Sequence, residues 1–257
     1  MDQDQRRGFL IESFLSERED LCGIAVPEDA ASQRELLRGL MNVRKPGLPS
    51  EDVLEVQDSY LRMRLEERET TKFRQLEAVR PHLYLWKGDI TTLECDAIVN
   101  AANSGMTGCW SPNHSCIDNC IHTFAGVQLR WECDRIMRAQ GHPEPTGRAK
   151  ITPAYNLPCK RVIHTVGPIV DGWLTDEHRA LLASSYRSCY ELAKEHGLRS
   201  MAYCCVSTGV FGFPQEEAAR IAIGTVDALR KADSDPLDVV FNVFTDADLR
   251  IYSRLLS

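Results

Sequence analysis

After Pro81, short apolar segments alternate with longer amphipathic ones, and this alternation restricts the chain to few folds. The short segments have the length of strands, and the longer ones repeat their apolar residues with the period of a helix. Such alternation predicts a mostly parallel sheet with helices on both of its faces. The predicted strands are residues 82–87, 97–100, 161–165, 200–206 and 239–244, and the predicted helices are residues 117–139, 178–196 and 215–231.

Residues 1–80 follow a different pattern, that of charged amphipathic helices. Apolar stripes with helical spacing run through Phe9, Leu10, Phe14 and Leu15 and through residues 36, 37, 40 and 41. Pro27 and Asp29 precede the second helix, and a linker over residues 46–50 ends at Ser50, a suitable N-cap for the third. We therefore expect a helical N-terminal extension over residues 1–80 and an α/β domain over residues 81–257.

The charge of the chain argues against nucleic acid as a partner. The formal net charge is -7, and the pI is near 5.6, whereas nucleic-acid binding needs clustered Lys and Arg. The chain also lacks an apolar run long enough for a membrane span, and residues 1–20 are too charged for the core of a signal peptide. The 10 cysteines are spread through a chain with a large core, so we expect mostly buried thiols and a cytoplasmic protein.

Ligands of parallel α/β sheets bind at loops beyond the carboxyl ends of the strands, and three such loops carry suggestive residues. Gly88 and Asp89 follow the first predicted strand, which alone is typical of a turn or helix cap. Residues 100–103 place two Asn residues around two Ala residues. The Asn amides can donate and accept hydrogen bonds, and the small Ala side chains leave room for a ligand to approach the backbone. Residues 207–214 form a glycine-bearing loop before a helix, which suits a diphosphate.

In this order and at these strand ends, the three loops resemble those of the macrodomain family, which binds ADP-ribose. The resemblance extends from Pro81 to the C-terminus and implies a three-layer α/β/α fold with a mixed, mostly parallel central sheet. It also implies that Asp89 hydrogen-bonds adenine, that Asn103 faces the distal ribose and that residues 207–213 enclose the diphosphate. The substrate-binding residues expected from it are Asp89, Ile90, Asn100, Asn103, Ser207, Thr208, Gly209, Val210, Phe211, Gly212 and Phe213.

The loop after Asn103 departs from the common family pattern, in which a run of glycines precedes an Asp. Here Cys109, His114 and Cys116 place two thiols and an imidazole within eight positions, a donor set suited to Zn²⁺. The loop resembles the Cys-x4-His-x-Cys metal loop of a zinc-containing macrodomain branch. Alternatively, the two cysteines form a redox pair, or they are ordinary thiols beside a turn histidine. Three protein ligands would leave one position open, as in catalytic zinc sites.

Asp118 and Asn103 are the expected catalytic residues. Hydrolysis needs a positioned water, a group that accepts its proton and stabilisation of charge at the breaking bond. We expect zinc to orient the distal ribose or to activate the water, Asp118 to act as base or orienting group, and Asn103 to fix the ribose. Asp118 has an alternative role as a helix N-cap.

Several nearby residues carry weaker expectations. Cys120 is expected to pack rather than to bind metal, and His122 shares a helix face with Asp118, which allows either a supporting or a purely structural role. The end of the last predicted strand could bring Asn242 or Phe244 near the adenine. Asn242 interrupts an apolar run, and core packing is the favoured interpretation for Phe244.

The function expected from these residues is zinc-dependent hydrolysis of mono-ADP-ribose from protein side chains. A reader that only binds ADP-ribosylated protein is one alternative, and a hydrolase of a small metabolite such as O-acetyl-ADP-ribose is another. The resemblance implies ADP-ribose and a mono-ADP-ribosylated protein as partners, in this branch a lipoyl-carrier protein modified by a sirtuin-type transferase. Neither nucleic acid nor a membrane is expected as a partner.

Overall fold

A computed structural model describes residues 1–21 and 23–257. Its central sheet has seven strands in the order β2-β3-β9-β8-β5-β7-β6. The strands are β2 (Ala78–Arg80), β3 (Leu83–Lys87), β5 (Ala97–Ala101), β6 (Ala149–Pro153), β7 (Arg161–Thr165), β8 (Ser200–Tyr203) and β9 (Asp238–Val243). A separate two-stranded sheet pairs β1 (Thr71–Lys72) with β4 (Leu93–Glu94).

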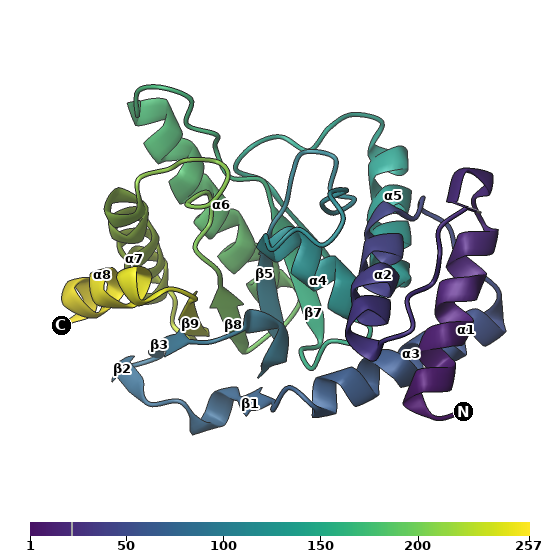
Figure 1. Cartoon of the computed structure of the whole chain (residues 1–257). Coiled ribbons are helices and arrows are strands. Elements are labelled where there is room, and N and C mark those ends of the chain that lie inside the picture. The colour runs from purple at the N-terminus through teal and green to yellow at the C-terminus, as the bar shows by residue number, and fades with distance from the viewer. Residues whose placement is uncertain (22) are drawn as a thin grey trace.

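Helices cover both faces of the central sheet, so the expected three-layer α/β/α fold with a mixed, mostly parallel sheet is confirmed (Figure 1). The sheet is covered by α4 (Ile117–Ala125), α5 (Val127–Gln140), α6 (Asp176–Glu195), α7 (Gln215–Ala232) and α8 (Asp246–Leu256). The N-terminal helices are α1 (Gln3–Ser16), α2 (Ala30–Val43) and α3 (Glu51–Glu66), and the short 3-10 turns are η1 (Glu19–Leu21), η2 (Phe73–Gln75) and η3 (Ile90–Thr92). None of the helices in the described part of the chain is long and apolar enough to cross a membrane.

The five inner strands are parallel and end at one edge of the sheet. The pairs β3–β9, β9–β8, β8–β5 and β5–β7 are all parallel. The outer strands β2 and β6 are antiparallel to their neighbours and were not predicted. Both are short or contain proline, and β2 is half-exposed to exposed along its length, so neither shows the apolar run of an inner strand.

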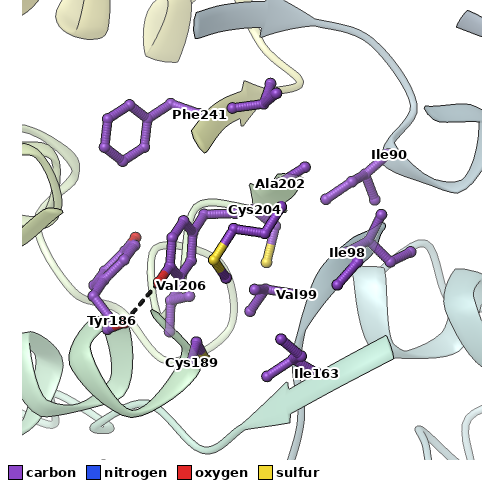
Figure 2. Close-up of a cluster of buried hydrophobic side chains, with 14 of the residues drawn as sticks. Ile90, Ile98, Val99, Ile163, Tyr186, Cys189, Ala202, Cys204, Val206 and Phe241 are labelled. Atoms are coloured by element: carbon purple, nitrogen blue, oxygen red, sulfur yellow. Dashed lines mark hydrogen bonds between the residues drawn. The ribbon is translucent and has the colours of Figure 1, made fainter. Parts of the chain in front are cut away.

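The main core lies between the sheet and the helices. Figure 2 shows Val99 of β5 beside Ile163, its register partner on β7, with Tyr186 and Cys189 of α6 on the same side, whereas Ile98 lies toward Ile90. Tyr203 is also buried, and its hydroxyl donates a 2.6 Å hydrogen bond to the Tyr186 carbonyl. The hydroxyl is therefore paired, which removes the usual cost of burying it.

The N-terminal extension has a smaller core of its own that docks against α5. Leu10, Phe14, Leu37 and Tyr60 belong to this core, and Val127 at the start of α5 joins it. Hydrogen bonds also join the extension to the domain. Gln57 accepts a 3.0 Å hydrogen bond from the Val127 amide, and Asn42 donates one of 2.9 Å to Thr123. These paired and buried groups fix the extension on the α4–α5 side of the domain.

Three predictions of secondary structure need correction. The helix predicted over residues 117–139 is two helices, because the backbone of Gly126 is non-helical, with a φ of +99° that favours glycine. The strand predicted over residues 200–206 ends at Tyr203. The C-terminal helix α8 was missed, although Thr245 caps it by accepting from the Asp248 amide, a recognisable start signal.

Candidate functional site

The residues expected to bind ligand lie along one edge of the sheet in a consistent order. Asp89 follows β3, Phe244 follows β9, the loop 204–214 follows β8 and Asn103 follows β5, and these four strands are adjacent in that order. Neighbouring strands lie about 4.8 Å apart, so the four loops span roughly 15 Å. This edge can therefore hold an elongated ligand, with one end near Asp89 and the other near Asn103.

Asp118 is buried at the Asn103 end of this edge. Its two oxygens accept hydrogen bonds from Asn100 Nδ2 at 2.8 Å and from Asn103 Nδ2 at 3.1 Å. Burial raises the pKa of Asp118 to about 6, although these hydrogen bonds and the charge of Arg130 act to lower it. A buried carboxyl with a raised pKa is typical of groups that exchange protons.

The alternative role of Asp118 as an N-cap does not fit the structure. Cys116 occupies the N-cap position of α4, and Asp118 is the second residue of the helix. The Asp118 side chain accepts from Asn100 and Asn103, which come from the β5 strand and the following loop. Helix α4 therefore serves to place the carboxyl at the sheet edge, and its acidic first turn is favoured by the helix dipole.

Asn100 is held in place by His164 of the neighbouring strand β7. The Asn100 amide lies 3.1 Å from His164 Nδ1, and Thr152 Oγ1 lies 3.0 Å from Nε2 of the same ring. Because Asn100 can only donate from Nδ2, His164 Nδ1 must be unprotonated. Burial lowers the pKa of His164 to about 3, which keeps the ring neutral. His164 thus orients the amide that orients Asp118.

The three predicted metal ligands come together. One ligand atom each from Cys109, His114 and Cys116 lies within 4.8 Å of the other two, and Cys109 Sγ is 3.6 Å from His114 Nδ1. Burial and the nearby Cys109 raise the pKa of Cys116 to about 12. Cys120 lies outside this group and contacts Arg38 instead.

Gly108 and His122 connect the metal loop to Asp118. Gly108 has a φ of +83°, and a β-carbon there would lie 2.8 Å from the His122 ring. The other side of that ring faces Asp118, with His122 Nε2 3.6 Å from Asp118 Oδ1. Burial lowers the pKa of His122 well below its usual value, so the ring is a neutral spacer between loop and carboxyl.

Arg130 of α5 supports the same loop from the other side. Its guanidinium donates a 3.4 Å hydrogen bond to the Cys109 carbonyl and lies 4.3 Å from the centre of the Trp110 ring. Other hydrogen bonds from Arg130 reach carbonyls at the end of α2, including that of Asn42 at 2.5 Å. Arg130 therefore ties the metal loop to the N-terminal extension as well as to the domain.

The loop after β8 offers backbone donors to a ligand. The amides of Gly212 and Phe213 are used inside the loop, in hydrogen bonds of 3.0 Å to Gly209 and Ser207. The amides of residues 209–211 make no hydrogen bond to any residue that the structure describes. Helix α7 contributes less than expected, because Glu216 and Glu217 in its first turn already balance its dipole. The unpaired loop amides are thus the stronger indication of an anion site.

The side chains of this loop differ in what they can contact. Phe213 is buried, Phe211 is half-buried and Val210 is 80% exposed. Ser207 has a φ of +66°, and its hydroxyl is buried without a hydrogen-bond partner. Of the aromatic residues here, only Phe211 is placed to contact a ribose with its side chain.

Asp89 and Ile90 lie at the opposite end of the edge. Asp89 accepts hydrogen bonds from the Thr91 amide at 2.9 Å and from Arg68 at 2.5 Å, and its side chain is 41% exposed. The Ile90 side chain is buried in the core (Figure 2), so only its backbone can face a ligand. Arg68 also stacks on Phe124, 3.7 Å from the ring centre.

The core position expected for Phe244 is wrong, since its side chain is 72% exposed. It follows β9 directly, and β9 pairs with β3 so that Val243 lies opposite Lys87. The backbone of Phe244 therefore lies beside the Gly88–Asp89 loop. Asn242 is buried and donates a 2.9 Å hydrogen bond to the Gly88 carbonyl, which explains the polar residue in an apolar strand.

The sequence alone did not single out Arg68, Arg130 or His164. The signal for His164 was a polar residue inside an otherwise apolar strand, the same signal that drew attention to Asn242. Arg68 and Arg130 lie in charged helical stretches, where arginine is ordinary. Their roles depend on packing between segments far apart in the chain.

Comparison with known proteins shows the family of the chain. The chain matches the family model described as Macro domain over residues 99–222. A protein of Treponema medium named protein-ADP-ribose hydrolase is 54% identical over 261 residues, and the match covers 100% of both chains. A protein of Staphylococcus aureus with the same name is 49% identical, over 97% of this chain and 94% of the relative.

Solved macrodomain structures are also similar. The Trypanosoma brucei macrodomain in complex with ADP-ribose has a TM-score of 0.66 at 30% identity and covers 90% of this chain and 97% of that one. A mutant of the Oceanobacillus iheyensis macrodomain with ADPR has a TM-score of 0.62 at 36% identity, covering 68% of this chain and 91% of that one. A match over 90% of the chain must include much of the N-terminal extension.

Proposed function

This chain belongs to the macrodomain family, and from that premise we propose that it is a zinc-dependent hydrolase that removes mono-ADP-ribose from modified protein side chains. The observation that carries the proposal is the proximity of three elements at one end of the sheet edge. These are the buried Asp118, the Asn103 amide that binds it, and the loop with Cys109, His114 and Cys116. The name of the Treponema and Staphylococcus relatives, protein-ADP-ribose hydrolase, supports the hydrolase activity, and the zinc dependence rests on the loop residues alone.

The chain's own residues bind and orient the ADP-ribose. The free amides of residues 209–211 donate to the diphosphate, and Phe211 packs against a ribose. Asp89 at the far end receives the adenine, and Phe244 offers it an exposed ring. The distal ribose then lies at the end of the edge where Asn103 and Asp118 meet, which brings the bond to be broken next to the carboxyl.

Asp118 acts as the base or as the group that orients the attacking water. Its oxygens already accept from Asn100 and Asn103, so the carboxylate has a fixed direction before substrate binds. Asn103 contacts both the carboxylate and the Gly108 carbonyl, at 3.1 Å each, and so sets the distance between Asp118 and the metal loop. Such preorganisation lowers the barrier because no group must reorient during reaction.

The loop residues suit a zinc ion. A tetrahedral ion with usual Zn–S and Zn–N lengths holds its sulfur and nitrogen ligands roughly 3.6 Å apart, and Cys109 Sγ and His114 Nδ1 are separated by 3.6 Å. Burial and the nearby Cys109 raise the pKa of the Cys116 thiol, so this thiol resists ionisation unless a cation compensates its charge. A bound Zn²⁺ would supply a Lewis acid beside the distal ribose.

Two alternatives share the pocket. A reader that only binds ADP-ribosylated protein needs neither a buried carboxyl of raised pKa nor a metal loop. A hydrolase of O-acetyl-ADP-ribose would use the same residues.

The proposal also includes the substrate and the location of the protein. The proposed substrate is a lipoyl-carrier protein modified by a sirtuin-type transferase, and the proposed location is the cytoplasm. The nine described cysteines are free thiols, in keeping with that location.

The test compares two substrates with the purified full chain, a mono-ADP-ribosylated protein and O-acetyl-ADP-ribose, and uses free ADP-ribose as a binding control. Faster release of ADP-ribose from the protein than from the acetyl ester supports the proposed function. Faster hydrolysis of the acetyl ester favours the metabolite hydrolase. Binding of ADP-ribose without hydrolysis of either substrate indicates a reader.

A further inference from the structure

A groove separate from the ADP-ribose edge lies where the N-terminal extension meets helix α4. It has a volume of about 310 Å³ and is bounded by α2, α3 and the end of α4. Figure 1 shows α2 lying beside α4, with α3 close to their lower ends. Its apolar lining includes Leu37, Met41, Leu61 and Phe124, and its basic lining is Arg34, Arg38 and Arg64.

The arginines of the groove are poorly matched by acids. Arg34 makes no side-chain hydrogen bond or ion pair to any residue within the described ranges. Arg38 donates to the His114 carbonyl, to Asn119 and to Cys120, none of them a carboxylate. Its Nε is buried and has no hydrogen-bond partner, which leaves a donor without an acceptor.

Two acids nearby offset only part of this charge. Arg64 pairs with Glu67 one helical turn away. Glu35, which also lines the groove, is exposed to solvent. Burial raises the pKa of Tyr60 in the groove, whereas the charges of Arg64, Arg7 and Arg34 act to lower it. The groove is therefore locally positive in a chain whose formal net charge is -7.

One end of the groove reaches the catalytic region through Arg38. This side chain lines the groove and also donates a 2.8 Å hydrogen bond to the carbonyl of His114, a predicted metal ligand. It donates another of 2.9 Å to Asn119, the neighbour of Asp118 on α4. A segment lying in the groove is thus only one side chain away from the metal loop.

We propose that this groove is the docking site for an acidic, partly apolar segment of the ADP-ribosylated protein. An apolar floor between two helices with a basic rim matches a peptide that carries apolar anchors and carboxylates. The carboxylates pair with Arg34, Arg38 and Arg64, and the apolar side chains cover Leu61 and Phe124. That the segment belongs to the ADP-ribosylated protein rests on the proposed function, whereas its acidic and partly apolar character is inferred from the groove alone.

The test measures binding of a fluorescent peptide of alternating Glu and Leu to the full chain by anisotropy. A peptide in which Lys replaces Glu is the charge control. The variant combines Arg34→Glu with Arg64→Glu. Arg62→Glu is the matched control, since Arg62 lies on the same helix α3 but is exposed and does not line the groove. ADP-ribose affinity and thermal stability are measured on every protein.

The acidic peptide should bind the unaltered chain and the Arg62→Glu control equally and the double variant at least tenfold more weakly, with ADP-ribose affinity the same in all three. Binding should weaken as salt rises. Absence of binding by the unaltered chain, or an equal loss in the Arg62→Glu control, overturns the proposal. Peptide binding that depends on Arg34 and Arg64, without hydrolysis of any ADP-ribosylated substrate, keeps the docking site and refutes the proposed function.

Discussion

Asn103 Nδ2 donates a 3.1 Å hydrogen bond to Asp118 Oδ2 and another of 3.1 Å to the Gly108 carbonyl. One amide thus joins the buried carboxyl to the loop that carries the predicted metal ligands. The two catalytic residues expected from the sequence are in direct contact, although 15 positions separate them. This contact is possible because β5 ends beside the first turn of α4.

Replacing the carboxyl of Asp118 should abolish turnover while sparing binding. Asp118→Ala should lower kcat by roughly 10² to 10⁴-fold, the usual contribution of a positioned acid or base. ADP-ribose affinity, measured by calorimetry, should change only a few-fold. Asp134→Ala, which removes an Asp paired with Arg138 on the surface of α5, is the control and should keep full activity. Unchanged turnover in Asp118→Ala would exclude a catalytic role.

Gly108 should tolerate no side chain. A residue with a β-carbon at its φ of +83° is strained and would press on the His122 ring, so Gly108→Ala should cost about 1–3 kcal/mol. Because the ring contacts both loop and carboxyl, kcat and metal content should fall as well. The same change in Gly224→Ala, in the middle of α7 with open space around it, should instead stabilise by about 0.5–1 kcal/mol. Thermal denaturation and metal analysis check both variants.

Acid should destabilise the protein through its buried neutral histidines. The pKa of His164 falls to about 3 in the folded state, so between pH 6.5 and 3 the unfolded chain binds the extra proton. The contribution of His164 to the free energy of unfolding is therefore fully present above pH 6.5. It declines as the pH falls, by roughly 1.4 kcal/mol per pH unit. His122 adds to the slope in the same direction.

The variant His164→Gln isolates this effect. Groups common to both proteins cancel in the comparison, so the free energy of unfolding should fall less steeply between pH 7 and 5 in the variant. Urea denaturation at each pH gives the two slopes. Equal slopes would show that His164 is already charged, or exposed, in the folded protein.

Phe244 should contribute to ADP-ribose binding and not to folding. Its ring is 72% exposed beside the Asp89 loop, and stacking of a base on an aromatic ring is worth about 1–3 kcal/mol. Phe244→Ala should therefore weaken ADP-ribose roughly tenfold with little change in Tm, and Phe244→Tyr should restore binding. A lowered Tm with unchanged affinity would return Phe244 to a packing role.

Much of the fold could be predicted from local pattern, and the exceptions have physical causes. The five inner strands are largely apolar because most of their residues are buried or half-buried, so they were found. The edge strands β2 and β6 lack such runs. Gly126 lies inside a helical pattern, and only its positive φ in the structure shows that the helix breaks there.

The candidate site was predicted where chemistry is local in the chain. Cys109, His114 and Cys116 lie in one loop, so their spacing carried the signal. His164, Arg130 and Arg38 reach the site from other elements, through contacts that span 64, 21 and 76 positions. Phe244 was misassigned because an aromatic residue at a strand end has the same sequence pattern whether it faces core or solvent.

The most direct test of the central claim measures ADP-ribose release from a mono-ADP-ribosylated protein together with zinc content, on the same samples of the unaltered chain and of Cys116→Ala. The account predicts about one zinc per chain and turnover in the unaltered protein, with both lost in the variant while ADP-ribose binding persists. Full turnover by a Cys116→Ala protein that contains no zinc would contradict it.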